Sequence, residues 1–158
     1  MPELSNFTFD ELLVGQTATY SRVVNEQDIH LFAAVSGDVN PVHLDAEFAA
    51  STPFGERIAH GMLTGAFISA ALAMELPGPG TIYLSQTLRF RLPVKIGDTV
   101  SVALEVTAKT PRRQIVTLDC KASNDAGKLV ATGTAEVMAP SQKLVLPRPA
   151  TPRAQVLA

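Results

Sequence analysis

The chain has 158 residues, which is the length of one domain of ordinary size. Its net charge of -2 leaves no basic excess for nucleic acid or for an anionic membrane surface, so we exclude both as partners. The single cysteine, Cys120, excludes an internal disulfide and a cysteine-rich metal cluster. The acidic first ten residues show no signal-peptide pattern, and we expect a soluble, cytoplasmic protein.

The first part of the chain predicts a strand, a helix and a polar loop. Residues Thr17 to Val24 are rich in β-branched side chains and predict the strand. Asn25 and the acidic residues after it predict the start of a helix, which ends at Gly37. Glycine and proline punctuate the segment from Asp38 to His43, so we expect a bent loop there.

A second helix is predicted over residues 60–75, which are apolar nearly all round. Because no face of this helix is polar, we expect protein to surround it. It is shorter than the roughly 20 apolar residues that a membrane span needs, so we interpret it as a helix buried inside a domain. The segment Pro77–Gly80 ends it.

The second half of the chain alternates apolar and polar residues with a period of two. Four such sets lie within residues 82–92, 100–107, 116–122 and 129–137, and Gly133 in the last is a candidate β-bulge. One polar face predicts an antiparallel sheet that is covered on one side.

These elements predict an α+β fold in which the sheet curls around the apolar helix. We place this single domain at residues 1–139 and expect residues 140–158, a Pro-rich tail, to be extended or disordered. The open edge of the sheet would pair with a second copy of the chain, so we expect a symmetric homodimer.

Asp38, Asn40 and His43 are the strongest candidates for chemistry. Aspartate and histidine are common general acid–base groups near neutral pH, and together they can hold one water molecule. Such a pair suits the addition of water to a double bond or its removal. The alternative interpretation is a cluster that only caps helices and shapes a turn, because Asp and Asn often bond local backbone groups.

The start of the apolar helix is the second candidate. Unpaired N–H groups at a helix N-terminus can stabilise a developing oxyanion, and Gly61 has no side chain to obstruct a carbonyl there. Gly61 could instead serve close packing alone. Ser69 lies two turns further on, where its hydroxyl either bonds its own backbone or faces a pocket.

A metal site is the weaker interpretation of the same residues. Asp38, His43, Asp45 and His60 could be collected into one, but they lack the spacing of known metal ligands. We therefore expect no metal.

Three motifs resemble those of the MaoC-like (R)-specific enoyl-CoA hydratases. They are SGDVNPVH at residues 36–43, HGM at 60–62 and RFxxPVxxGD at 89–98. The resemblance runs from about Phe9 to Val137 and is greatest to the short, single-domain members that supply (R)-3-hydroxyacyl-CoA for polyhydroxyalkanoate synthesis. It implies the hotdog fold, an antiparallel sheet wrapped around one long helix, and a homodimer.

The resemblance also implies roles for individual residues. Asp38 and His43 would activate one water for addition to a trans-2-enoyl-CoA, and Asn40 would orient the water or the acid. The N–H of Gly61 would bind the thioester oxygen, and Ser69 would lie near the site. No cofactor is implied, because CoA is part of the substrate. A hotdog acyl-CoA thioesterase and a non-catalytic acyl-CoA-binding module are the alternatives.

Overall fold

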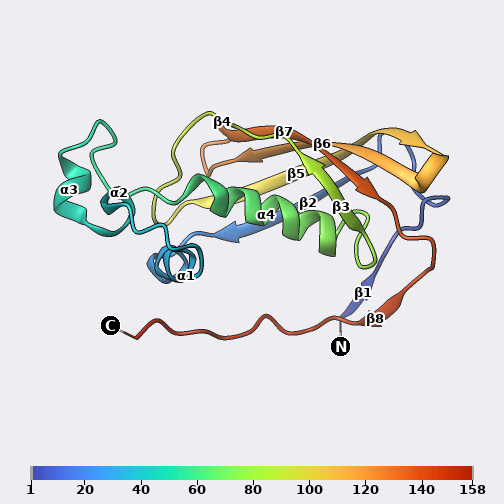
Figure 1. Ribbon diagram of the computed structural model, residues 1–158, viewed down its shortest axis with the longest axis horizontal. Coiled ribbons are helices and arrows are strands. Elements are labelled where there is room, and N and C mark those ends of the chain that lie inside the picture. The colour runs from blue at the N-terminus through green and yellow to red at the C-terminus, as the bar shows by residue number, and fades with distance from the viewer. Residues whose placement is uncertain (1, 158) are drawn as a thin grey trace.

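The main body of the computed structural model, which describes residues 2–157, is a curved antiparallel sheet along one long helix (Figure 1). Its strands follow the order β2-β5-β6-β7-β3, and β4 also pairs with β7. Their bounds are β2 (Thr17–Val23), β3 (Ile82–Gln86), β4 (Arg89–Phe90), β5 (Thr99–Thr110), β6 (Ile115–Ser123) and β7 (Leu129–Met138). The early strand thus joins the late ones, as the sequence predicts.

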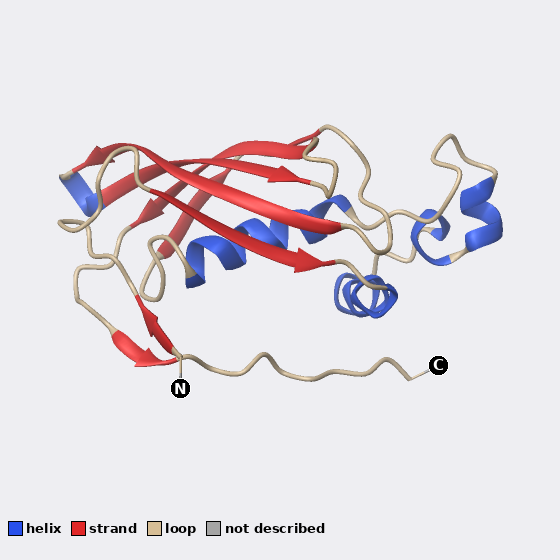
Figure 2. Ribbon diagram, turned by 180° about the vertical axis from the view of Figure 1, so that it is seen from behind, coloured by secondary structure: helices blue, strands red, loops and turns tan. Residues whose placement is uncertain are grey.

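The long helix α4 (Gly61–Met74) lies along one face of this sheet and contacts β2, β5 and β6 (Figure 2). The remaining helices are α1 (Glu26–Ser36), α2 (Pro41–Leu44), α3 (Ala46–Ala50) and the 3₁₀ turn η1 (Arg112–Gln114). None of the helices within residues 2–157 has both the length and the apolar character that crossing a membrane requires.

The ends of α1 follow from its sequence. Asn25 and Asp28 form a reciprocal capping box at its start. Gly37 ends it with a φ of 78°, in the left-handed region that glycine adopts without strain. The polar segment that follows is therefore fixed in place by a well-defined helix end.

The core lies between α4 and the sheet. Side chains of β5 and β6 alternate between buried and more exposed positions, which confirms the predicted period of two. Ile68 and Leu72 of α4 are buried against them. Cys120 of β6 is fully buried, and this burial raises the pKa of its thiol to about 11.

The prediction of one covered strand over residues 82–92 is wrong in two respects. The strand is interrupted between β3 and β4, where the main-chain N–H of Thr87 donates to Thr134. Its apolar side chains are also uncovered, since Ile82 is 54% and Phe90 51% exposed. Alternation identifies an apolar face, but it does not tell whether the same chain covers that face.

The prediction that protein surrounds α4 is also wrong for a single chain, because an apolar sequence does not tell whether the same chain covers the helix. The sheet covers one side of this helix, whereas Met62 on another side is 56% exposed. An uncovered strip of apolar surface therefore follows α4 and the neighbouring edge of the sheet.

Gly133 is not at a bulge, because it pairs in register with Cys120. The register of β6 and β7 shifts elsewhere, between Ala122 and Ser123. A Cβ atom on Gly133 would stand 1.8 Å from the main-chain oxygen of Thr87. Glycine is needed here for close backbone approach, which lets the connection between β3 and β4 lie against β7.

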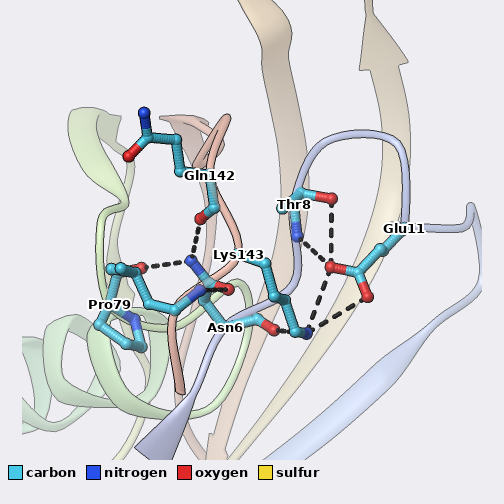
Figure 3. A network of polar contacts seen from close by, with 7 residues as sticks. Asn6, Thr8, Glu11, Pro79, Gln142 and Lys143 are labelled. Atoms are coloured by element: carbon cyan, nitrogen blue, oxygen red, sulfur yellow. Dashed lines mark hydrogen bonds and ion pairs between the residues drawn. The ribbon is translucent and has the colours of Figure 1, made fainter. Parts of the chain in front are cut away.

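The tail contains a strand that its sequence does not signal. Strand β8 (Val145–Pro147) pairs with β1 (Glu3–Ser5), apart from the main sheet. The buried side chain of Asn6 holds this region together through its bonds to the main chains of Pro79, Gln142 and Leu144 (Figure 3). Residues 148–157 have no regular secondary structure, and Gln27 of α1 donates to the carbonyl of Ala154.

Candidate active site

Asp38 and His43 lie close together, but on different kinds of structure. Asp38 is on the loop after α1, whereas His43 is on the one-turn helix α2 and not on a loop as predicted. Two residues explain this helix: Asn40 caps it by accepting from the N–H of Val42, and Pro41 occupies its first position. Four residues are too few to show a helical period in a sequence.

The two side chains face each other across a short gap. His43 Nε2 lies 3.9 Å from Asp38 Oδ2, which is longer than a hydrogen bond. His43 Nδ1 lies 2.8 Å from the carbonyl oxygen of Ile58, so Nδ1 donates. In the neutral ring Nε2 then carries a lone pair. The His43 side chain is 10% exposed and that of Asp38 is 49% exposed, so solvent reaches the pair from the carboxylate side.

Asn40 shapes this segment through two hydrogen bonds. Its side-chain oxygen caps α2, and its main-chain N–H donates to Asp38 Oδ1 over 3.2 Å. Both contacts belong to the turn interpretation, and the second also holds the carboxylate of Asp38 in place.

Arg57 fixes α2 against α1. Its Nε donates to the carbonyl of His43 at 2.7 Å, and its Nη1 lies 2.8 Å from the Glu26 carboxylate. The hydrogen bond from Arg57 lowers the pKa of Glu26 below its usual value. No local sequence pattern indicates this role, because Arg57 connects three separate segments of the chain.

Gly61 is the first residue of α4 and lines a cavity of about 440 Å³ together with Asp38. Because the first N–H groups of a helix lack partners within it, the positive end of α4 borders this cavity. Phe32, Met62 and Phe90 supply apolar walls. The structure thus brings the acid and the predicted oxyanion position into one cavity.

Ser69 does not line that cavity but an adjoining groove of about 510 Å³. Phe32 and Met62 line both spaces, so the groove continues from the cavity along α4. Tyr83 and Gln86 stand on the other side of the groove and bond each other through their side chains. Partial burial raises the pKa of Tyr83 to about 12.

His60 lies at the centre of the site. It is 3% exposed, its ring stacks on His43, and its Nε2 lies 2.9 Å from the main-chain oxygen of Asp38. Its position directly before Gly61 is the sequence feature that places His60 near the site, but its contact with His43 depends on the tertiary fold.

The residues considered for a metal site come together only in part. Ligand atoms of Asp38, His43 and His60 lie within 4.8 Å of one another. Asp45 instead caps α3 by accepting from Glu47 and Phe48. The rings of His43 and His60 are stacked at 3.8 Å with 26° between their planes, and one nitrogen of each ring donates to a main-chain carbonyl.

An antiparallel sheet curved along one helix, with Asp38 and His43 beside the start of that helix, defines a hotdog-fold protein. Residues 13–126 match the family model described as MaoC like domain. The chain therefore belongs to the MaoC-like family.

Similar proteins cover nearly the whole chain. An (R)-specific enoyl-CoA hydratase of Rhodospirillum rubrum is 46% identical over 134 residues, which are 85% of this chain and 92% of that protein. A 3-hydroxybutyryl-CoA dehydratase of Methylorubrum extorquens is 46% identical over 143 residues, 90% of each chain. The solved structure of the R-hydratase PhaJ1 from Pseudomonas aeruginosa is 54% identical and covers 98% of this chain and 99% of its own, with a TM-score of 0.93.

Proposed function

We propose that the protein adds water to trans-2-enoyl-CoA to give (R)-3-hydroxyacyl-CoA, and catalyses the reverse dehydration. The observation that carries this proposal is the distance of 3.9 Å between Asp38 Oδ2 and His43 Nε2. Asp38 and Gly61 line one cavity beside this pair. The names of the similar hydratases and dehydratase support the same reaction.

The pair of side chains suits one water molecule. A separation too long for a direct hydrogen bond leaves room for a water that both groups contact. The water oxygen bonds to C3 of the substrate while its proton passes to one member of the pair. The pair returns a proton to C2, so that the elements of one water are added and the enzyme ends in its starting state.

Negative charge develops on the thioester oxygen during this addition. The N–H of Gly61, at the positive end of α4, is the group we assign to that oxygen. The acyl chain would then extend along the groove past Ser69. Asn40 would hold Asp38 through its main-chain N–H.

Two wider proposals accompany the reaction. The product class is the one that polyhydroxyalkanoate synthesis consumes, as the resemblance of the motifs implies.

The groove is open along the uncovered side of α4, and we propose that a second copy of the chain closes it in a homodimer. No cofactor takes part in the proposed reaction, because the reacting groups are those of the protein, the substrate and water.

Loss of the ultraviolet absorbance of the enoyl thioester, followed with crotonyl-CoA, tests the reaction. We expect Asp38→Asn and His43→Gln each to lower kcat by about 100- to 10,000-fold, the range for loss of an acid–base group. Asp45→Asn is the matched control, because asparagine also caps helices and the side chain of Asp45 accepts hydrogen bonds from the start of α3. It should retain wild-type activity. Chiral chromatography of the product should give the R enantiomer.

The two alternatives give different results in the same assay. Release of free thiol from acyl-CoA without hydration would identify a thioesterase. Saturable binding of crotonyl-CoA without turnover would identify a binding module. Full activity in both the Asp38 and His43 variants would contradict the assigned roles.

A further inference from the structure

His60 contacts both members of the acid–base pair from one buried position. Its Nε2 lies 2.9 Å from the main-chain oxygen of Asp38, and because a carbonyl only accepts, Nε2 donates. Its ring stacks on that of His43, with centroids 3.8 Å apart, and lies 4.9 Å from the ring of Phe32. One side chain therefore touches the loop that carries the acid and the ring that carries the base.

Packing alone does not require a histidine at this position. His60 is 3% exposed, and its Nδ1 is buried with no hydrogen-bond partner among residues 2–157. A buried polar nitrogen without a partner opposes folding, and an apolar residue would fill the space without that loss. The histidine is better explained by what its Nε2 and its ring face do.

The two reacting groups need such support. Asp38 is on a loop, its side chain is half exposed, and its carboxylate accepts a hydrogen bond from the main-chain N–H of Asn40. The bond from His43 Nδ1 to Ile58 fixes one atom of the imidazole but still permits the ring to tilt about it. A face contact with His60 limits that tilt.

We propose that His60 is a positioning residue, which fixes the distance between the Asp38 carboxylate and the His43 imidazole at the value that accommodates one water. This inference rests on the proposed function, since it concerns the same pair of groups. His60 contacts no reacting atom in this scheme and acts only through Asp38 and His43.

Three substitutions separate the contributions of His60. His60→Gln keeps a donor near the position of Nε2 but loses the ring, whereas His60→Phe keeps a ring face and loses the donor. His60→Leu keeps neither. For crotonyl-CoA hydration we expect the leucine variant to lower kcat about 100-fold, with KM changed less than about threefold, because small displacements of catalytic groups have effects of this size. The other two should fall between it and the wild type.

Two controls distinguish positioning from a general structural role. Val116→Ala, in the buried part of β6, should lower the unfolding temperature and leave kcat per folded molecule unchanged. In the Asp38→Asn background, His60→Gln should lower kcat by less than about threefold further, because the group through which it acts is already lost.

Each outcome decides the proposal. A wild-type protein without hydratase activity would overturn the proposed function and this inference with it. An active wild type with His60→Gln and His60→Leu variants within twofold of it would overturn the inference alone. His60 variants with a raised KM and an unchanged kcat would also overturn it. So would a His60→Gln substitution that lowers kcat in the Asp38→Asn background as much as it does in the wild type. If the leucine and phenylalanine variants fail to fold, the glutamine variant and its double variant carry the test.

Discussion

Gly61 lines the same cavity as Asp38, and the ring of Phe90 lies where its side chain would stand. A Cβ atom there would be 3.1 Å from Phe90 Cε1, which is closer than most real Cβ contacts. Phe90 is 51% exposed, however, so its ring can move by the small distance needed. The fold therefore tolerates a methyl group at Gly61, and any loss of activity would report on the ligand.

We predict that the free energy of unfolding of Gly61→Ala lies within about 1 kcal/mol of the wild-type value, because alanine is more favourable than glycine in a helix by about that amount. Its kcat/KM should fall at least tenfold for crotonyl-CoA and for longer enoyl-CoA alike, because the thioester is common to all of them. Urea unfolding and the absorbance assay measure the two quantities.

Gly65→Ala is the matched comparison one turn along α4. Its Cβ would meet Met62 Cε and Leu88 Cδ1, both at 3.2 Å, inside the groove assigned to the acyl chain. Four residues of helix span about 6 Å, so this methyl group lies beyond the reach of a four-carbon acyl group. It should lower kcat/KM more for 2-octenoyl-CoA than for crotonyl-CoA. Equal losses for both substrates would contradict the assigned direction of the acyl chain.

At the scale of the elements, Gly133 determines how the interrupted strand lies on the sheet. Its Cβ position is occupied by the main-chain oxygen of Thr87, 1.8 Å away, and a main chain cannot move aside as the Phe90 ring can. We predict that Gly133→Ala destabilises the fold by about 3 kcal/mol, at the upper end for overpacking. The same substitution at Gly61 is the control in urea unfolding. Similar stability of the two variants would show that the connection between β3 and β4 is not held as described.

The elements that the sequence predicts well are those with enough residues to carry a pattern. The capping box of α1 and the alternation in β5 and β6 are local, and the structure confirms them. Strands β1 and β8 have three residues each and depend on the distant contacts of Asn6, so no local pattern predicts them.

The same distinction between local patterns and tertiary contacts holds in the site. The motif predicted Asp38, His43 and Gly61, whereas the stack of His60 on His43 arises only from the tertiary fold.

At the scale of the whole molecule, the chain exposes more surface than its mass predicts. Its accessible surface is 9099 Å², whereas a compact monomer of 16.8 kDa exposes about 7,600 Å². Each partner in a standard protein interface buries roughly 800 Å². Part of the excess belongs to the extended tail, and part to apolar side chains along α4 and the β3 edge, where Met62, Ile82 and Phe90 are each at least half exposed. Continuous apolar surface beside an open strand edge is the feature that favours a second copy.

We predict that the protein is a dimer of the 16.8 kDa chain at micromolar concentration, and that Ile82→Lys converts it to a monomer. Ile82 is on the edge strand β3 and is 54% exposed, so a lysine there leaves the isolated chain intact but would carry an unpaired charge into the contact. Leu13→Lys is the control, because Leu13 is 68% exposed in a turn of the N-terminal segment, and it should remain dimeric. Size-exclusion chromatography with light scattering measures both masses. A monomeric wild type would contradict the dimer, and a dimeric Ile82→Lys variant would move the contact away from β3.

If the groove along α4 is closed by the second copy, the monomeric variant should also bind the longer enoyl-CoA substrates more weakly, since Met62 and Leu84 would then face water.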